Sequence, residues 1–383
     1  MAPAAPLTIL LSCSGAFVVL GAPLAQAAEP RTSRAAVPGD ASGLVAPNCA
    51  ATGLSPCWSS IQQGIDGIEA LHPDAPIRTL YIAPGEYRET AVCMPAAGNT
   101  NLIGMGLGNT LIARGTASIT PPKDDGPAAT LTLGGCNVQN LRVLVGEDDG
   151  DRGIYLTGLP VPEQVVSDVT VNGKLGAGAV GIDVAFTAGF VAFMNTRVIL
   201  NCLASADADT AALRVEVPDG KFAELRFEYG LFELKNAPCP LDASVFDFRR
   251  SSTGGGALGT EIFFAQVQCV ETTCFEIAAD GVNLNLGSID LRRNQARFFR
   301  VHGDGSSSRI FLKGIESAFD FREPSIWNNV TPHGALNLTV PSDSTVAPPE
   351  QCFPGWTLTL ESGPPGRTFA VCEGSAPPAW VFK

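Results

Sequence analysis

The chain has 383 residues, a formal net charge of −13 and only 16% charged residues. This acidic balance disfavours nucleic acid as a partner, because phosphate binding needs clustered Lys and Arg. The 41 glycines, together with many Val, Leu and Phe residues, exclude a disordered chain and are typical of an all-β protein with a long core and many loops.

The N-terminus predicts export. Residues 7–20 form an apolar run too short to cross a bilayer, and Ala25-Gln26-Ala27 fits a small-x-small cleavage site. We expect residues 1–27 to be a signal peptide and residues 28–48 to be a flexible leader, in a protein that is secreted or periplasmic. Lipoprotein anchoring at Cys13 is the less favoured alternative. No later stretch predicts a membrane span.

Cysteine usage agrees with export. One of the 11 cysteines lies in the signal peptide, and the even number left predicts structural disulfides in an oxidising compartment. A zinc site would need CxxC-type clusters, which the sequence lacks. Spacing leaves the connectivity open, and the pairs that it favours are Cys49/Cys57, Cys93/Cys136, Cys202/Cys239, Cys269/Cys274 and Cys352/Cys372.

A short helix is expected near residue 60. Ser59 or Ser60 can cap it, and Ile61, Ile65 and Ile68 form one apolar stripe. A helix this short is marginal alone, so we expect it to dock on the rest of the protein.

The body of the chain repeats. Four-residue strand patterns with a small or apolar first residue begin at intervals of 24 to 33 residues, and most intervals hold a second strand, such as 190–193 or 309–312. The repeated patterns are Gly153-Ile154-Tyr155-Leu156, Gly181-Ile182-Asp183-Val184, Ala212-Leu213-Arg214-Val215, Val245-Phe246-Asp247-Phe248, Cys274-Phe275-Glu276-Ile277 and Phe298-Phe299-Arg300-Val301.

A period of this size with short strands predicts a solenoid, in which each coil stacks on the next and like residues align. The expected fold is a single-stranded right-handed parallel β-helix over residues 49–340. The pairs Cys93/Cys136 and Cys202/Cys239 would then link neighbouring coils. A β-sandwich is the main alternative, but it needs hairpins, and tight hairpin turn signals are almost absent.

The N-terminal part of this region resembles the pectin-lyase-like β-helix superfamily. The resemblance covers about residues 58–115 and rests on a capping-helix segment, Leu80-Tyr81-Ile82-Ala83-Pro84-Gly85-Glu86-Tyr87 and Leu102-Ile103-Gly104-Met105-Gly106. It implies the fold and an N-terminal cap. It implies no single activity, because the fold hosts lyases, hydrolases, esterases and adhesive tail proteins.

The last segment, residues 341–383, is rich in Pro and Gly. Residues 356–360 and 368–371 predict a small hairpin closed by Cys352/Cys372, and residues 380–382 predict a final strand. We interpret the segment as a C-terminal cap, with a tail-fibre-type appendage as the alternative.

Two motifs are weak. The run Gly176-x-Gly178-x-x-Gly181 satisfies a dinucleotide pattern, but a strand-like segment follows where a helix is needed. The segment around Asp183 is similar to the region of the pectinesterase nucleophile, which makes Asp183 a catalytic candidate. A solvent-facing strand Asp is the alternative.

The acidic loop Glu147-Asp148-Asp149-Gly150-Asp151 is the candidate metal site. Oxygen-rich loops of this sort can bind Ca²⁺, so Asp148, Asp149 and Asp151 are the candidate ligands. A solvated acidic turn is the alternative.

Arginine pairs form the candidate substrate site. Phe246-Asp247-Phe248-Arg249-Arg250 and Phe319-Asp320-Phe321-Arg322 are near-copies, and Asp290-Leu291-Arg292-Arg293 lies between them. If the coils align these segments, an Asp/Arg ladder results on one outer face, and Arg forks pair well with uronate carboxylates. The predicted roles are catalytic for Arg249 and Arg292 and substrate-binding for Arg250, Arg293 and Arg322. An ion-pair ladder without a ligand is the alternative.

These features lead to two functional hypotheses. In the first, the exported protein binds an acidic polysaccharide or cell-surface glycan, and acts on it as a lyase or other carbohydrate-active enzyme. In the second, it is a non-catalytic surface or adhesion β-helix. An enzyme should gather Asp and Arg on neighbouring coils.

Overall fold

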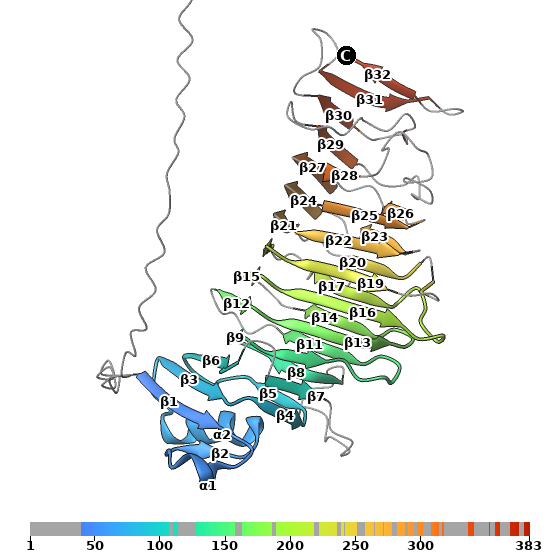
Figure 1. The fold of residues 1–383 in the computed structure, drawn as a ribbon. Helices are drawn as coiled ribbons and strands as arrows, with labels where there is room; N and C mark the ends of the chain where they lie inside the picture. Colours follow the sequence, from blue (N-terminus) through green and yellow to red (C-terminus); the bar gives the residue numbers. More distant parts are fainter. Residues whose placement is uncertain are drawn as a thin grey trace, which may run out of the picture. The chain divides into compact units, whose positions relative to one another are not determined.

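Most strands of the chain pair in parallel with a strand one coil earlier, and most coils contain three strands (Figure 1). The computed structural model describes residues 40–106, 110–113, 128–157, 163–185, 189–217, 222–235, 239–240, 242–250, 257–263, 265–270, 272–277, 282–287, 290–294, 297–301, 308–313, 316–317, 336–340, 352, 357–360, 368–374 and 379–383. Within these ranges the strands form three sheets, here called A, B and C. The predicted right-handed parallel β-helix is confirmed.

Sheet A has 15 strands among the described residues and receives the first strand of each coil. Its strands are β1 (Asp40–Val45), β2 (Cys57–Trp58), β3 (Ile77–Ile82), β6 (Asn99–Gly104), β9 (Cys136–Gln139), β12 (Gln164–Ser167), β15 (Gly189–Met194), β18 (Phe222–Glu228), β21 (Ala257–Phe263), β24 (Val282–Gly287), β27 (Ser308–Lys313), β29 (Leu336–Val340), β30 (Thr357–Leu360), β31 (Phe369–Glu373) and β32 (Ala379–Phe382).

Sheets B and C receive the second and third strands of each coil. Sheet B contains β4 (Gly85–Arg88), β7 (Thr110–Ala113), β10 (Arg142–Leu144), β13 (Thr170–Leu175), β16 (Arg197–Cys202), β19 (Leu231–Lys235), β22 (Gln266–Val270), β25 (Asp290–Asn294) and β28 (Glu316–Ser317). Sheet C contains β5 (Ala91–Cys93), β8 (Ala129–Leu133), β11 (Arg152–Thr157), β14 (Val180–Ala185), β17 (Ala211–Val217), β20 (Ser244–Arg250), β23 (Thr273–Ile277) and β26 (Arg297–Val301).

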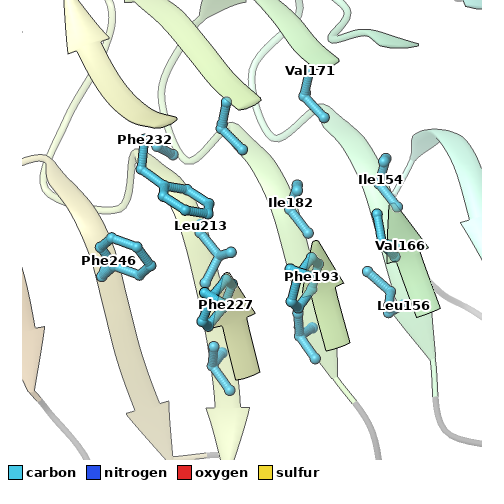
Figure 2. Close-up of a cluster of buried hydrophobic side chains, with 14 of the residues drawn as sticks. Ile154, Leu156, Val166, Val171, Ile182, Phe193, Leu213, Phe227, Phe232 and Phe246 are labelled. Carbon is cyan, nitrogen blue, oxygen red and sulfur yellow. The ribbon is translucent and has the colours of Figure 1, made fainter. Parts of the chain in front are cut away.

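The core lies inside the coils and is built from residues that alternate along each strand. Figure 2 shows how inward side chains of successive coils stack, for example Ile154, Ile182, Leu213 and Phe246 along sheet C. Aromatic rings continue these stacks, and the rings of Phe193 and Phe227 lie parallel with centroids 4.6 Å apart. Burying such rings accounts for much of the hydrophobic stabilisation of the central coils.

The corner between sheets A and B has the same form in four successive coils. Only two residues separate the strands there, and the first of them has a left-handed backbone at Asn140, Asp168, Asn195 and Tyr229. The second is buried, as at Leu141 (1% exposed). Asn and Asp tolerate the left-handed conformation better than most residues, and the Asn195 amide also donates to the Asp168 carboxylate at 2.7 Å.

The predicted capping helix is confirmed as α2 (Ile61–Leu71). The Ser60 hydroxyl accepts a hydrogen bond from the backbone N–H of Gln63, and Ile61, Ile65 and Ile68 are buried. The Glu89 carboxylate accepts from the backbone N–H groups of Ile61 and Gln62 at 2.7 and 3.0 Å, which holds a negative charge at the helix N-terminus.

One expectation near this cap is wrong in part. Residues 28–48 were expected to be a flexible leader, but residues 40–45 form β1, which pairs in parallel with β3 along its whole length. The strand buries Val45 completely under α2, and this apolar contact orders the end of the leader. Residues 1–39, which include the predicted signal peptide, lie outside the described residues.

All five favoured disulfide pairs are confirmed. Each pair has its two sulfur atoms within bonding distance, and the bridges are Cys49–Cys57, Cys93–Cys136, Cys202–Cys239, Cys269–Cys274 and Cys352–Cys372. The predicted link between neighbouring coils holds for Cys93–Cys136, which joins the last residue of β5 to the first residue of β9, across two successive corners between sheets C and A.

The bridge Cys202–Cys239 also links neighbouring coils, but its two ends differ. Cys202 is the last residue of β16, whereas Cys239 lies outside the strands, in the connection that follows β19 of the next coil. Both residues are buried, and Cys239 is 6% exposed. The Cys239 Sγ lies 3.8 Å from the Lys235 carbonyl oxygen. This contact is not a hydrogen bond, because a disulfide sulfur carries no proton to donate. Cys239 is therefore a structural cysteine and not a free thiol.

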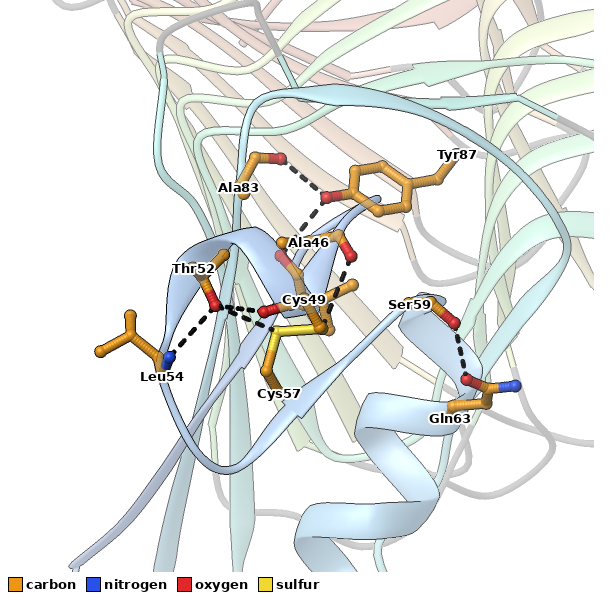
Figure 3. Close-up of a disulfide and its surroundings, with 10 residues drawn as sticks. Ala46, Cys49, Thr52, Leu54, Cys57, Ser59, Gln63, Ala83 and Tyr87 are labelled. Atoms are coloured by element: carbon orange, nitrogen blue, oxygen red, sulfur yellow. Dashed lines mark hydrogen bonds between the residues drawn. A yellow bond between two sulfur atoms is a disulfide. The ribbon is translucent and has the colours of Figure 1, made fainter.

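Figure 3 shows the first bridge, Cys49–Cys57, which joins the short helix α1 (Cys49–Thr52) to β2. Tyr87 lies nearby, and its hydroxyl donates to the Ala83 carbonyl at 2.9 Å. Burial, followed by the charge of Glu89, raises the pKa of Tyr87 to about 12, so this phenol stays protonated and keeps its hydrogen bond.

The C-terminal segment forms the expected hairpin and final strand. Strands β30 and β31 pair antiparallel, β32 adds to β31, and Cys352–Cys372 closes the hairpin. These are the antiparallel pairings of sheet A in the described chain.

Candidate functional site

The outer face of sheet C carries a line of polar residues in lateral register. Strand alternation turns these side chains outward, because the residues on both sides of each one point into the core. The pairings of β11, β14, β17, β20 and β23 align one residue from each coil. We call these residues the charged row: Tyr155, Asp183, Arg214, Asp247 and Glu276.

Arginines neutralise two carboxylates of the charged row, those of Asp183 and Asp247. Arg152 Nε lies 2.7 Å from Asp183 Oδ2, and Arg214 Nε lies 2.9 Å from Asp247 Oδ2. A third arginine, Arg249, places its Nε 2.5 Å from the same Asp247 oxygen. Ion pairs of this kind need good geometry and further hydrogen bonds, because burial of both charges is costly.

Asp247 is the most buried member of the row. Its side chain is 0% exposed, and its second oxygen, Oδ1, has no hydrogen-bond partner in the described part of the chain. Burial raises the pKa of Asp247, and neighbouring Glu276 acts in the same direction, while Arg214 and Arg249 lower it. Perturbed carboxylates are typical of functional sites, although buried structural ion pairs are perturbed too.

Arg249 connects the row to the exposed loop between β16 and β17. Its Nη1 lies 2.6 Å from Asp209 Oδ1, and the side chains of the two residues are 29% and 63% exposed. The hydrogen bond from Arg249 is the main cause that lowers the pKa of Asp209. The loop is held in place by Asp207, which accepts from the backbone N–H of Gly178 at 2.9 Å.

The structure places the predicted arginines on different sheets. Arg249 lies in β20 of sheet C, next to Glu216, whereas Arg292 lies in β25 of sheet B, next to Gln268. The expected ladder of Arg249 with Arg292 is therefore wrong, because the two segments occupy different positions in their coils. Arg250 and Arg293 are in the same two strands, but their side chains lie outside the described residues, as does all of Arg322.

Asp183 does lie on the same face as Arg249. It occupies β14, two strands from β20, and is 5% exposed because Arg152 and its neighbours cover it. The two residues belong to one face but do not touch each other: Asp183 pairs with Arg152, and Arg249 pairs with Asp247 and Asp209.

Carboxylates of the acidic loop accept hydrogen bonds from backbone N–H groups. Asp149 accepts from the N–H of Ala177 at 3.0 Å, and Asp151, 2% exposed, accepts from the N–H of Asp148 at 3.1 Å. Over the described ranges, no group of three or more His, Cys, Asp or Glu side chains could hold a metal ion. Calcium binding by this loop stays an untested prediction.

Several residues of the site were not assigned a role from the sequence: Arg152, Asp209, Arg214, Asp247 and Glu276. A signal for three of them was present. Arg214, Asp247 and Glu276 all stand third in the repeated four-residue strands, as Asp183 does. Arg152 and Asp209 lie outside those strand patterns, and only their contacts in the folded chain reveal them.

The fold and this row define the class of the protein, a parallel β-helix with a charged outer face. Neither a protein-family model nor a curated protein matches the chain. Among the solved structures, the chain is similar to the pectin methylesterase from Aspergillus niger in penultimately deglycosylated form, with 15% identity, a TM-score of 0.43, and coverage of 79% of this chain and 92% of that one.

Two further structures are similar. One is the pectin methylesterase PemA from Erwinia chrysanthemi, with 13% identity, a TM-score of 0.39, and coverage of 80% of this chain and 90% of that one. The other is tailspike protein 2 from the Escherichia coli O157:H7 bacteriophage CAB120, with 12% identity, a TM-score of 0.42, and coverage of 78% of this chain and 43% of that one. At these identities the likeness is one of fold, and it assigns no activity to this chain.

Within the described part of the chain, no helix has the length and apolar character needed to cross a bilayer.

Proposed function

We propose that the protein binds an acidic polysaccharide along the outer face of sheet C, outside the cytoplasm. The observation that carries the proposal is the pair between Arg249 and Asp209. Arg249 is partly exposed, and the carboxylate that it binds belongs to a largely exposed loop residue. A uronate carboxylate can replace Asp209 there, because an exposed ion pair contributes about 0–1 kcal/mol.

The geometry of the sheet suits a polymer. Neighbouring strands lie about 4.8 Å apart, so an extended chain that runs along the row meets one coil after another. The buried carboxylates repel a polyanion only weakly, because Arg152 and Arg214 neutralise Asp183 and Asp247. Arg249 then offers the guanidinium fork that pairs well with carboxylate.

Export is supported by the five disulfides. Disulfides persist in oxidising compartments and are rare in the cytosol. A secreted or periplasmic protein would meet polysaccharide there.

The test compares two neutralising substitutions. Asp209→Asn removes the competing carboxylate, so we expect the affinity for polygalacturonate or alginate to rise about threefold. Arg249→Gln removes the binding group, so we expect the affinity to fall at least about tenfold. Isothermal titration calorimetry measures both, after circular dichroism has shown that each variant folds.

Two matched controls separate the site from the overall charge. Glu147→Gln changes the charge as Asp209→Asn does, at a side chain that is 68% exposed and far from Arg249 in sequence. Arg197→Gln removes an exposed arginine from sheet B. Both should leave the affinity nearly unchanged. If Asp209→Asn behaves like Glu147→Gln, or Arg249→Gln like Arg197→Gln, the proposed site is wrong.

A non-catalytic role is the second candidate, and the burial of the row favours it. Asp183, Asp247 and Glu276 are at most 7% exposed, so a polymer on this face contacts Arg249 before it contacts any of these three carboxyl groups. Incubation with polygalacturonate and alginate, with and without Ca²⁺, should give binding without unsaturated product. Accumulation of unsaturated product would instead establish a lyase.

A further inference from the structure

The outer face of sheet A carries a different surface from that of sheet C. Between β3 and β12, its outward strand positions hold amide, hydroxyl and apolar side chains and no charged one. The pairings of β3, β6, β9 and β12 place these residues side by side. We call this surface the amide face, and it consists of Tyr81, Asn101, Ile103, Asn137, Gln139, Val165 and Ser167.

Side-chain amides replace backbone pairing at the centre of the amide face. Strands β9 and β12 pair at two residue positions, Val138 with Val166 and Gln139 with Ser167. Upstream of these, the N–H of Val165 donates to Asn137 Oδ1 at 2.9 Å. A hollow of about 260 Å³ lies over this region, lined by β6, β9 and β12.

Some polar groups in and around the hollow bond to each other, and others have no hydrogen-bond partner among the described residues. Asn137 Nδ2 donates to Asn101 Oδ1 at 3.0 Å. Across the described ranges, the Nδ2 of Asn101, the amide of Gln139 and the hydroxyl of Ser167 make no hydrogen bond to protein. Such groups offer both donors and acceptors to a ligand with many hydroxyls.

An apolar platform adjoins these amides. Tyr81 pairs laterally with Ile103, and Met105 follows β6 directly. The side chains of Tyr81 and Met105 are 41% and 57% exposed. They line a second hollow of about 230 Å³, whose wall also contains Leu54 and Pro56. A sugar ring has apolar C–H faces and polar edges, and a Tyr ring beside amides matches both.

We infer that the amide face binds an uncharged glycan chain, at a site independent of the Arg249 site on sheet C. The lack of charged side chains on the amide face favours an uncharged ligand over an acidic one. The amide face has no counter-charge for a uronate, whereas the same sheet carries Glu224, Arg226 and Glu228 further along, in β18. Uncharged hydroxyls can use the free amide and hydroxyl groups without leaving a buried charge unpaired.

The experiment uses the full-length protein and defined probes. Neutral hexasaccharides of β-1,4-glucose, α-1,4-glucose, β-1,4-xylose and β-1,4-mannose are titrated and followed by saturation-transfer NMR and calorimetry. We expect saturable binding of at least one probe. Tyr81→Ser removes the platform and Gln139→Ala removes an exposed amide, and each should weaken that binding about fivefold.

Two further variants locate the site. Arg197→Ala on sheet B is a surface control, and Arg249→Gln tests independence from sheet C. Neither should change the affinity for the neutral probe. The inference is overturned if all four probes fail to bind, or if binding survives both Tyr81→Ser and Gln139→Ala in folded protein. Loss of binding in Arg249→Gln alone would place the glycan on sheet C and would also overturn it.

Discussion

Arg214 lies between two buried carboxylates of the charged row, Asp183 and Asp247. Substitution of Arg214 should lower the stability of the protein more than substitution of any other residue of the row. Its guanidinium Nε holds Asp247 at 2.9 Å, and its Nη2 donates to the Asp209 carbonyl. The Asp247 side chain has no exposure to solvent. Removing one partner of a buried ion pair is destabilising, because the other charge is left without compensation.

We predict that Arg214→Gln lowers the free energy of unfolding by about 3 kcal/mol at pH 7. Burial already raises the pKa of Asp247, and the substitution removes a group that lowers it. A carboxyl with a raised folded pKa contributes its stability below the unfolded pKa of about 3.9 and loses it as the pH rises through the folded pKa. The deficit should therefore be smallest near pH 4 and should grow toward pH 7.

Urea unfolding at a series of pH values measures this deficit. Arg142→Gln is the control, because Arg142 is an exposed sheet B residue whose Nε donates to Asn172 rather than to a carboxylate. A deficit of equal size at pH 4 and pH 7 would show that Asp247 does not titrate as its surroundings indicate.

The sequence contained a signal for the charged row that the comparison of short similar segments did not reveal. The third residues of the repeated strands are the residues of the charged row, and aligning the repeats by position identifies them. The pairing of Arg249 with Arg292 followed instead from the similarity of two short segments. That similarity does not say which sheet a strand joins, and the two strands belong to sheets C and B.

Helix α2 shows how tightly a cap is fitted to the first coil. Gly64 faces β1 and β3, and a Cβ atom there would lie 2.5 Å from Val45 Cγ2 and 2.9 Å from Leu80 Cδ2. Helix propensity alone favours Ala over Gly by about 1 kcal/mol. Packing opposes it, because the helix cannot approach the sheet as closely when a methyl group intervenes.

We predict that Gly64→Ala destabilises the protein by about 1–3 kcal/mol despite the better helix propensity. Gln63→Ala, at an exposed position of the same helix, should change stability by less than about 0.5 kcal/mol. Thermal unfolding monitored by circular dichroism compares the two. A stabilised Gly64→Ala variant would mean that α2 sits further from the coil than described.

Several elements could be predicted, for physical reasons that differ. The cap followed from the spacing of Ile61, Ile65 and Ile68, and the hairpin of β30 and β31 followed from two strands between paired cysteines. Short strands such as β10, with three residues, gave too little pattern to find. Strand β1 was missed because its sequence, Asp40–Val45, is rich in small residues and becomes a strand through its pairing with β3.

The coils as a whole depend on contacts between neighbours. Phe246 packs on Phe232 and Phe275, with ring centroids 4.9 and 5.1 Å away, so it connects β19 and β20 of one coil with β23 of the next coil. In a solenoid, stability is the sum of such nearest-neighbour contacts, and damage to one coil stays local.

We predict that Phe246→Ala costs about 3–5 kcal/mol and that the loss is confined in space. Amide hydrogen exchange should accelerate in β17, β20 and β23. Exchange in β3, β6 and β9 should keep its original rate. Phe193→Leu, which conserves most of the volume, is the milder control. Uniform acceleration over all coils would contradict nearest-neighbour stability and indicate a single cooperative unit.

The two-residue corners between sheets A and B constrain how this protein can change. At four successive corners a buried second residue follows a left-handed first residue, so an inserted residue would displace this second residue from the interior and disturb the register of the strand after it. New loops should therefore be tolerated less at these four corners than at the other two corners of the coil or in the longer connection from β6 to β7. Lineages of this chain should accumulate insertions at those more tolerant places, and grafted peptides should be accepted there, while the four short corners keep their length.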